Sequence, residues 1–399
     1  MDNYLVYRGL APFLRASIAG RDLRPLTQDM LQAFSADNAN ADLLMNLSIA
    51  FQCLNQKALG LEFQQAALAI AQTYVLPAAV QPARLRLLVL VCPGSIQSNT
   101  PLDCLLEVSD IELVFHYVLP DKGLLGDVPK HDVLFVGISD SEANRPLLSA
   151  LATALEAWPK PVLNSPQYLP FTGRDKASQL LQGIAGLRAP ATHRVSRSQL
   201  LALAAGQIEV GGIFSGAEFP LIVRPLGSQA GMDLQKVSNA AEVAAYLADL
   251  AEEQFFVAPF IDYSDANGLF RKIRVALVDG QPMVCHMAVS SNWMIHYVNA
   301  GMYEDAWKRS EEARFMNDFP QFVARHRVAL DAIGQRMRLE YLVMDCAETQ
   351  SGELLLFEID HGGVVHAMDL EDIFPYKNAH IHKVQDAFSA LLYSRMPAA

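Results

Sequence analysis

Three acidic residues near the end of the sequence have the types and spacing of a metal site. Glu358 and Asp360 stand two residues apart in the strand-like segment LLLFEID, so both side chains should leave the same face. Asp345 lies in another strand-like segment, YLVMDC, which could pair with the first in the antiparallel direction. Three carboxylates on one face repel each other unless a cation neutralises them, and hard oxygen ligands suit Mg²⁺. The pattern indicates a magnesium site; a hairpin with a chance cluster of acids is the alternative.

A cation followed by a flexible turn stands earlier in the chain, in the segment PLIVRPLGSQAG at 220–231. A strand-like run leads to Arg224, and Gly227, Ser228 and Gly231 follow at once. Glycines let the backbone approach an anion closely, and successive N–H groups can point at phosphate oxygens. The segment therefore predicts a phosphate contact, although a surface arginine beside a hairpin turn fits these residues as well.

Basic residues alternate with apolar ones in RKIRVALVDG, residues 271–280. On a strand, Arg271 would share one face with Ile273, whereas Lys272 and Arg274 would share the other. A solvated edge strand explains such a pattern in most proteins, so these residues alone do not decide their role.

The composition limits the classes of protein to be considered. The chain has 399 residues, 51% of them hydrophobic and 19% charged, which predicts two or three packed domains without extensive disorder. A formal net charge of -12 disfavours nucleic acid or a membrane surface as a partner. The five cysteines include no C-x-x-C pair and suggest no disulfide framework. Since no signal-peptide pattern or membrane-spanning stretch is found, a cytoplasmic location is expected.

The first part of the chain, residues 1–80, is expected to be helical. Apolar residues recur at helical spacing between residues 41 and 71, and Gly60 should break this pattern into two helices. The placement of Leu-Gly, Ala and Pro resembles a tetratricopeptide hairpin. Two roles stay open for this region: recognition of a peptide, carrier or partner chain, and a structural cap over the next domain.

From residue 84 onward, the sequence predicts strands and helices in alternation, which implies a doubly wound parallel sheet. Strands are expected at 85–91, 111–118, 131–138 and 161–164, with a crossover helix at 144–158. The first turn lacks a G-x-G-x-x-G motif, so a dinucleotide site in this sheet is disfavoured. After about residue 191 the pattern becomes α+β with mainly antiparallel strands. The predicted organisation is a helical region, an α/β domain and two α+β units, at 1–80, 81–191, 192–262 and 263–399.

The order of these pieces resembles the ATP-grasp superfamily, especially the branch that includes glutathione synthetase and the RimK-type amino-acid ligases. The resemblance covers about residues 85–399. The segments VLNSP, GRDKA and PAT are similar to the stretch that leads from the first sheet into the ATP lid; they lie at 162–166, 173–177 and 190–192. The resemblance implies a pre-ATP-grasp α/β domain, a lid subdomain and a C-terminal catalytic subdomain.

The resemblance also implies roles for individual residues. Arg224 and the glycine-rich loop after it would contact the phosphates of ATP, and Lys176 would make a weaker contact. Arg274, with Arg271 as a second candidate, would contact phosphate or the transferring group. The lid strand that passes the adenine carries over to Phe256, Val257, Ala258 and Phe260. The metal acids carry over to Asp345, Glu358 and Asp360, which would hold Mg²⁺ or, as an alternative, Mn²⁺.

The sequence departs from the family pattern at three positions. The usual strand lysine is Arg224, which offers a planar fork in place of a point charge. The usual glutamate of the lid strand is missing from VAPF, residues 257–260, so contacts to adenine would come from the backbone. The usual Glu-x-Asn pair is Glu358-Ile-Asp360, which keeps two metal ligands but changes the phosphate contact expected of the asparagine.

Two segments are expected on the substrate side. Polar and aromatic residues mix in SSNWMIHY after the strand at 281–289, and HGG directly follows the metal acids. The substrate candidates are Ser291, Asn292, Trp293, His296, His361 and Gly362. A place in the core for Trp293 and a structural role for His296 are the alternatives.

The resemblance implies a ligase. A substrate carboxylate, on a peptide or a specialised small metabolite, would attack the γ-phosphate of Mg-ATP to give an acylphosphate. An amine or another nucleophile would then displace phosphate, forming an amide bond. A kinase that phosphorylates a small molecule and a nucleotide-binding regulator are the alternatives, and a homodimer stays open.

Overall fold

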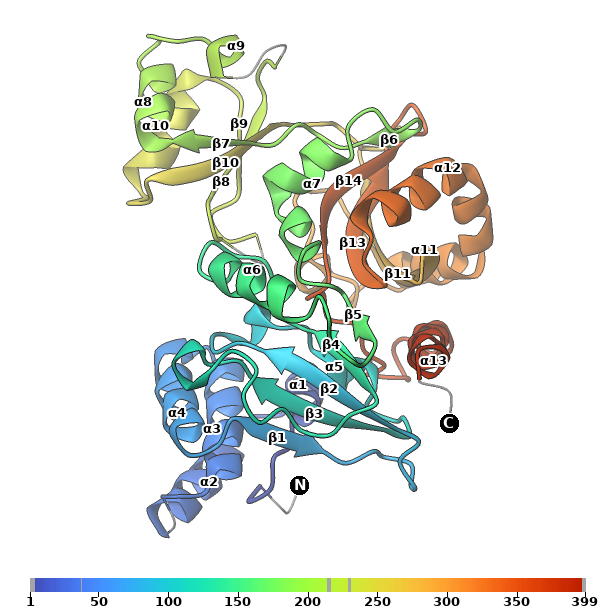
Figure 1. The fold of residues 1–399 in the computed structure, drawn as a ribbon. Helices are drawn as coiled ribbons and strands as arrows, with labels where there is room; N and C mark the ends of the chain where they lie inside the picture. The colour runs from blue at the N-terminus through green and yellow to red at the C-terminus, as the bar shows by residue number, and fades with distance from the viewer. Residues whose placement is uncertain (1–3, 37, 214–216, 229–230, 397–399) are drawn as a thin grey trace.

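The chain is described by a computed structural model that covers residues 4–36, 38–213, 217–228 and 231–396. Three β-sheets follow one another along the chain, each with helices packed against it (Figure 1). We name the corresponding parts the first domain, the middle domain and the C-terminal domain. The predicted mixed α/β class is confirmed. Within the described ranges, no helix combines the length and the apolar character needed to cross a membrane.

The first domain is built on a five-stranded sheet in the order β1-β3-β2-β4-β5. Its strands are β1 (Thr73–Leu76), β2 (Leu85–Val91), β3 (Ile111–Tyr117), β4 (Val133–Val136) and β5 (Val162–Leu163). The last four run parallel, as their apolar runs predict, because a parallel sheet is buried on both faces. β1 pairs with β3 in the antiparallel direction. This edge strand lies inside the region predicted to be helical, and that prediction is wrong for these residues.

Four helices precede the sheet (Figure 1). They are α1 (Ala11–Ile18), α2 (Arg24–Ala36), α3 (Ala41–Cys53) and α4 (Lys57–Ile70). Helix α2 packs on α3. Leu43, Leu44 and Leu47 of α3 are at most 1% exposed and share one apolar core with Leu87 and Val89 of β2. The helices thus form a layer of the first domain, which favours the structural cap over a separate recognition module.

The break between α3 and α4 lies at residues 54–56, where Asn55 adopts a left-handed φ of 60°. The prediction that Gly60 separates the two helices is wrong, because Gly60 lies inside α4. A Cβ atom on Gly60 would stand 2.6 Å from Cγ of Gln52 and 2.9 Å from the carbonyl oxygen of Ser48. Gly60 is therefore explained by the close approach of α4 to α3.

The other face of the first sheet is covered by α6 (Arg145–Ala154), within the predicted crossover helix. Leu148 and Leu151 of α6 are fully buried in one core with Leu88 and Leu134 of the sheet. Short elements complete this part of the chain: 3₁₀ turns at Ile96–Ser98, Pro120–Lys122 and Leu169–Thr172, helices α5 (Leu102–Leu105) and α7 (Arg174–Leu180), and strand β6 (Leu187–Arg188).

The middle domain is a four-stranded antiparallel sheet in the order β7-β10-β8-β9, packed with helices (Figure 1). Its strands are β7 (His193–Ser196), β8 (Leu221–Pro225), β9 (Gln235–Val237) and β10 (Gln254–Pro259), and its helices are α8 (Arg197–Ala204), α9 (Val210–Ile213) and α10 (Ala240–Ala248). Leu200 and Val243 of the helices pack with Val223 and Phe255 of the strands in a separate apolar core. The predicted small antiparallel unit is confirmed.

The C-terminal domain has a sheet in the order β12-β11-β13-β14-β6. Its own strands are β11 (Phe270–Val278), β12 (Gln281–Ser290), β13 (Tyr341–Glu348) and β14 (Leu354–Asp360), and its helices are α11 (Ala306–Asn317), α12 (Phe319–Met337) and α13 (Lys377–Ser394), with a 3₁₀ turn at Tyr297–Asn299. Phe322 and Ile333 of α12 pack with Val275 of β11, whereas Phe388 of α13 packs with Val278 and Val343. The two sets of helices therefore cover opposite faces of this sheet.

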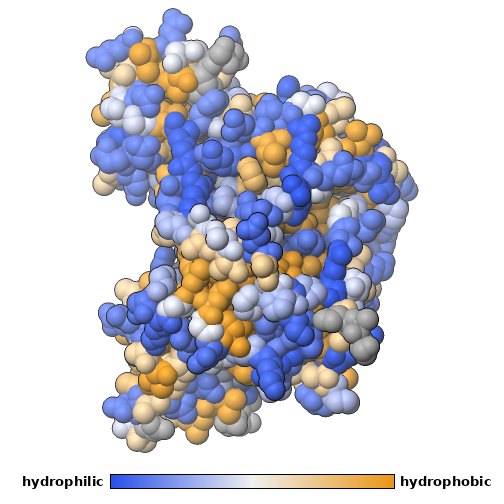
Figure 2. Space-filling view, viewed as in Figure 1, coloured by the Kyte–Doolittle hydropathy of each residue, from blue (hydrophilic) through white to orange (hydrophobic). Residues whose placement is uncertain are grey.

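The first and C-terminal domains share a core and a buried hydrogen-bond pair. Phe135 of β4 lies with its ring centroid 6.5 Å from that of Tyr341 and 6.0 Å from that of Phe388. The fully buried Asn164 donates to the carbonyl of Tyr341 over 2.8 Å and accepts from its N–H over 3.0 Å. On the face in Figure 2, apolar residues gather near the middle of the molecule, and the periphery is mostly hydrophilic.

We expect a chain that begins at residue 81 to be insoluble, because loss of α3 and α4 would expose apolar residues of the first sheet to water. A point substitution tests the same contact in the full chain: Leu47→Asp should lower the denaturation midpoint strongly, and Ala58→Asp, at an exposed position of α4, should not. Solubility and urea unfolding measure both effects. A soluble, cooperatively folding truncated chain would restore the recognition-module interpretation.

Candidate functional site

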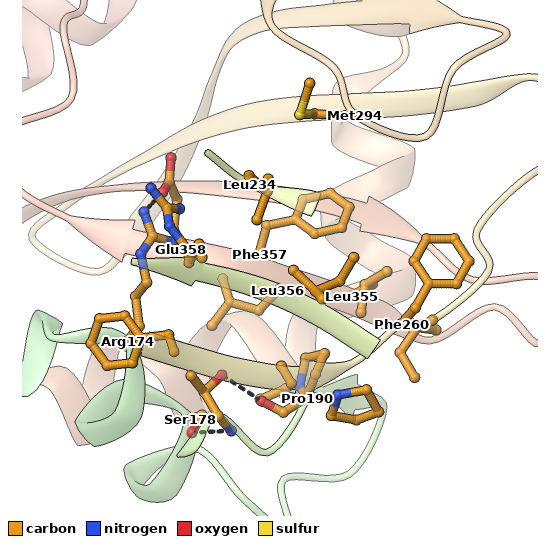
Figure 3. Close-up of a pocket in the computed structure, with 18 of the residues that line it drawn as sticks. Arg174, Ser178, Pro190, Leu234, Phe260, Met294, Leu355, Leu356, Phe357 and Glu358 are labelled. Carbon is orange, nitrogen blue, oxygen red and sulfur yellow. Dashed lines mark hydrogen bonds and ion pairs between the residues drawn. The ribbon is translucent and has the colours of Figure 1, made fainter. Parts of the chain in front are cut away.

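A cavity lies between the middle domain and the C-terminal sheet (Figure 3). Its walls come from α7, β8, β10, β14 and the segment 293–296. Charged and polar side chains at the cavity include Arg174, Arg224, Lys272, His296 and Glu358. Apolar side chains at the cavity include Pro190, Phe260, Ile261, Met294, Leu355 and Phe357. In Figure 3, Arg174 and Glu358 lie together at one end, and Pro190, Leu355 and Phe260 lie toward the other.

The charged end of the cavity is set by the register of three neighbouring strands. Arg274 of β11 stands opposite Asp345 of β13, which stands opposite Glu358 of β14. Lys272 and Asp360 are two residues from Arg274 and Glu358 on their strands, so their side chains share this face. The predicted antiparallel pairing that places Asp345 beside Glu358 is confirmed. β-bulges follow both Arg274 and Asp345, and bulges of this kind re-aim side chains next to functional sites.

The carboxylate of Asp345 is fully engaged by two cations. Its Oδ1 accepts from Nε of Arg274 over 2.8 Å, and its Oδ2 accepts from Nη2 of Arg274 over 3.1 Å. Nζ of Lys272 lies 2.7 Å from the same Oδ2. Burial would raise the pKa of Asp345, but the charges of Arg274 and Lys272 outweigh burial and hold that pKa well below its usual range. Asp345 is therefore a stable anion.

Glu358 and Asp360 are less completely neutralised than Asp345. Oε2 of Glu358 accepts a hydrogen bond from Arg174 on α7, and Oδ1 of Asp360 accepts one from the N–H of Gly363 over 2.8 Å. Burial raises the pKa of Asp360 to about 6, and the charge of Glu358 adds to this shift. Two neighbouring carboxylates repel each other because both are negative, and a cation between them relieves this repulsion.

These two acids fit a magnesium ion better than the predicted set of three. Mg²⁺ commonly binds through one or two carboxylates together with water and substrate phosphates. Glu358 and Asp360 each keep one oxygen without a hydrogen-bond partner in the described part of the chain, whereas both oxygens of Asp345 are taken. In the described ranges, no group of three or more His, Cys, Asp or Glu side chains is arranged to hold a metal ion.

Arg224, predicted to contact phosphate, lines the cavity from β8 and is 6% exposed. Its Nε donates to Oγ of Ser228 over 3.0 Å, and its Nη2 donates to the carbonyl of the same residue, which fixes the start of the glycine-rich loop. Burial, together with the nearby charge of Arg174, lowers the pKa of Arg224 to about 10. The buried Arg224 and the partly exposed Arg174, two like charges at one end of the cavity, indicate a place for an anion.

Gly231, after the glycine-rich turn, lies directly against His296. Gly231 has a left-handed φ of 71°, and a Cβ atom there would stand 2.4 Å from Nε2 of His296. Gly231 and His296 both line the cavity, whereas Gly227 and the hydroxyl-bearing Ser228 do not. Residues 229 and 230 of the loop lie outside the described residues.

The four predicted adenine contacts, on and just after β10, all line the cavity: Phe256, Val257, Ala258 and Phe260. Trp293 also lines it, with its ring edge-on to that of Phe260 at 5.7 Å between centroids. Nζ of Lys236 lies 4.1 Å from the centroid of the same Phe260 ring. Trp293 thus belongs to the aromatic wall of the cavity and not to an apolar core.

Several predicted residues lie away from the cavity. Arg271 is on the opposite face of the sheet from Arg274, where it pairs with Asp265 at 2.7 Å and Glu311 at 2.8 Å. The exposed Lys176 is not part of the lining. The same is true of the exposed Ser291 and Asn292. For Arg271 the structure corrects the prediction, because alternation along β11 turns its side chain away from the acids.

The two substrate candidates after β14 lie next to the first domain. His361 is fully buried beside the backbone of Gly137 and Ile138, and burial lowers its pKa to about 4. A Cβ atom on Gly362 would stand 3.0 Å from Oγ of Ser139, just after β4. Neither residue lines the cavity. Through these contacts, the carboxyl end of the parallel sheet lies close to Asp360. Ligands commonly bind at this edge of parallel sheets.

Sequence reasoning missed two cations of the site, Lys272 and Arg174. A signal for Lys272 was present, since it shares a strand face with Arg274. Arg174 lies two residues before Lys176, at the start of α7. The orientation of that helix decides which of the two side chains lines the cavity, and no pattern in the sequence predicts this orientation.

No protein-family model matches the sequence, and no curated protein matches it. Several solved structures are similar to this chain. D-alanine–D-alanine ligase from Bacillus anthracis, complexed with ATP, has 12% identity over 76% of this chain and 98% of that chain, with a TM-score of 0.44. VanG D-Ala:D-Ser ligase from Enterococcus faecalis has 15% identity over 77% and 99%, with a TM-score of 0.46. ATP-grasp ligase PsnB, complexed with precursor peptide PsnA2 and AMPPNP, has 13% identity over 78% and 99%, with a TM-score of 0.43. At this degree of similarity, any assignment of function depends on the residues of the site itself.

A buried polar network lies next to the cavity-lining segment 293–296. Nζ of Lys377, on α13, lies 3.6 Å from Oε1 of Glu312 and 3.3 Å from Oδ2 of Asp369. Oε2 of Glu312 accepts hydrogen bonds from the hydroxyls of Tyr297 over 2.7 Å and Tyr376 over 2.6 Å. Burial raises the pKa of Glu312, and the charge of Lys377 opposes that shift. The network ties α11 and α13 to the turn that directly follows the cavity-lining segment 293–296.

We expect Lys377→Met to reduce the free energy of unfolding by about 3 kcal/mol, because it leaves a buried carboxylate without its cation. Lys383→Met, on the exposed side of the same helix, should change it by less than about 0.5 kcal/mol. Urea denaturation followed by circular dichroism measures both values. Equal, small effects in the two variants would show that the network contributes nothing to stability.

Proposed function

We propose that this chain is an ATP-grasp enzyme, a Mg-ATP-dependent ligase that joins a carboxylate to an amine or another nucleophile. The observation that carries the proposal is the division of the cavity into two ends. Apolar side chains at one end suit a purine, and Arg174, Arg224 and Lys272 at the other suit a triphosphate. The middle domain would act as the lid over the nucleotide, and the C-terminal sheet would form its base.

The strand β10 offers a backbone acceptor to the purine. Because the N–H of Arg197 donates to the carbonyl of Glu253, the carbonyls of odd-numbered residues in β10 point toward β7. The pairing with β7 ends at Val257, so the carbonyl of Pro259 lies beyond it, in the cavity wall. This carbonyl would accept a hydrogen bond from the amino group of adenine and would repel the carbonyl of guanine. ATP is therefore the favoured nucleotide.

Each charged residue would have its own role in phosphoryl transfer. Glu358 and Asp360 would hold Mg²⁺, which would offset phosphate charge when bound. Arg224 would bind phosphate from the lid, and Arg174 would turn from Glu358 to a phosphate oxygen. Arg274 would stabilise the charge that develops on the transferred group.

The proposed reaction has two steps in one closed site. A substrate carboxylate attacks the γ-phosphate, giving an acylphosphate and ADP, and a nucleophile then displaces phosphate from the acyl carbon. Closure of the lid would exclude water, which would otherwise hydrolyse the acylphosphate. A kinase would transfer the same phosphoryl group to an alcohol and stop there, and a regulator would bind the nucleotide without turnover.

We expect Arg224→Ala to weaken nucleotide binding about ten- to hundredfold, because a charge-assisted hydrogen bond to phosphate contributes about 1.5–3 kcal/mol. Calorimetry with AMPPNP and Mg²⁺ gives the dissociation constant. Arg327→Ala is the matched control, since it removes a charge from the exposed side of α12. An unchanged dissociation constant in Arg224→Ala would place the triphosphate elsewhere.

Incubation with ATP, Mg²⁺ and pools of small carboxylates and amines tests the reaction itself. We expect ADP release together with a product whose mass equals the two substrates less one water. Glu358→Gln should abolish this release, because it removes a charged ligand from the metal pair. A product that carries an added phosphoryl group would identify a kinase, and nucleotide binding without ADP release in any pool would favour a regulator.

A further inference from the structure

Lys272, Asp345 and Arg274 form one ionic unit beside the charged end of the cavity, and of the three only Lys272 lines the cavity. Asp345 is 2% exposed, and all its ionic partners lie on the neighbouring strand β11. The side chain of Lys272 is 16% exposed and faces the cavity, so its ammonium group is held at the cavity wall. Arg274 uses two nitrogens on Asp345, and its third terminal nitrogen lies 3.4 Å from the carbonyl of Val364.

We propose that Asp345 is a positioning residue and not a metal ligand, and that it holds Lys272 and Arg274 so that they meet the terminal phosphate of the nucleotide. This inference rests on the nucleotide site proposed above. It assigns Lys272 to phosphate binding and leaves the metal to Glu358 and Asp360.

The charges of the ionic unit support this division of roles. Two cations surround one carboxylate, so the unit carries a formal charge of +1 and attracts an anion. A metal ion on Asp345 would have to displace an ammonium or a guanidinium group that already satisfies both oxygens in a buried place, which carries a desolvation cost. Glu358 and Asp360 differ from Asp345, because each keeps one oxygen without a hydrogen-bond partner among the described residues.

The geometry gives the same assignment. Lys272 and Arg274 are two residues apart and leave the same face of β11, and Asp345 stands opposite Arg274 in the register. A carboxylate in this position can hold both basic side chains at once. Without it, two adjacent cations would repel each other and turn apart.

The two roles for Asp345 predict opposite effects of Asp345→Asn on the protein without nucleotide. If Asp345 anchors the two cations, the substitution leaves both unpaired and lowers the denaturation midpoint. If Asp345 is instead one of three repelling metal acids, its neutralisation raises the midpoint. This measurement needs neither metal nor nucleotide, so it tests the anchor even if the proposed function fails.

Binding experiments test the second half of the proposal. We expect Asp345→Asn to weaken AMPPNP binding by about tenfold or more in calorimetry. At saturating AMPPNP, its affinity for Mn²⁺, followed by electron paramagnetic resonance, should stay within about twofold of the wild-type value. Glu358→Gln, in contrast, should cause a large loss of Mn²⁺ affinity. Asp345→Glu, which keeps the anion, should recover most of the nucleotide affinity.

Lys272→Met provides the same test if Asp345→Asn does not fold, because it keeps the pair between Asp345 and Arg274. It should weaken AMPPNP binding and leave Mn²⁺ binding unchanged. Loss of Mn²⁺ affinity in Asp345→Asn, or unchanged AMPPNP affinity in both variants, would overturn the proposal. Absence of AMPPNP binding in the wild type would instead overturn the proposed function.

Discussion

The register of β11, β13 and β14 is the constraint on which the rest of the site depends. It places Arg274, Asp345 and Glu358 side by side on one face of a sheet, in a partly desolvated region. Such a row is stable only if each charge has an opposite charge beside it, because like charges in adjacent positions repel at low effective dielectric. The observed order across the strands is cation, anion, anion, so Arg274 pairs with Asp345 and Arg174 of α7 pairs with Glu358. A shift of one residue in any strand would bury a charge in the opposite core.

The same sheet face carries charged residues along one part of its strands and apolar residues along the other. This arrangement positions the site between domains. Next to the charged residues, Val278 and Val343 pack against α13 and the first domain in one continuous core. The middle domain has its own core and touches the body through ion pairs, such as Arg194 with Asp175 and Glu142, each at 2.7 Å. Partly exposed pairs contribute little stability, at most about 1 kcal/mol each. The base of the cavity therefore belongs to the continuous core of the body, whereas the middle domain above it is joined to the body in part by ion pairs of small energy.

Local patterns predicted the elements of this fold but not the partners of its side chains. Continuous apolar runs identified the parallel strands, and the spacing of Glu358 and Asp360 placed both on one face. The edge strand β1 was missed, because four residues after a helix carry too little periodicity to be recognised. Lys176 and Arg271 were chosen by position in a motif, although the direction of α7 and the alternation of β11 turn them away from the cavity. The partners of Asp345 depend on which strand lies beside it, and this is a property of tertiary structure that a single sequence does not encode locally.

If the cavity binds a nucleotide as proposed, the balance of charge at its end would let an acidic protein attract that anion. The chain carries a formal charge of -12, which would repel a triphosphate at long range. Within the site, however, four cations (Arg174, Arg224, Lys272 and Arg274) face three acids (Asp345, Glu358 and Asp360), which leaves a formal excess of one positive charge. At physiological ionic strength, exposed charges beyond about 8 Å are largely screened, so the local excess outweighs the distant acids. Pairing with Glu358 keeps Arg174 at the cavity before a nucleotide arrives. In the proposed site, a metal ion bound to Glu358 would free Arg174 to turn toward the phosphates, so metal binding and triphosphate binding would reinforce each other.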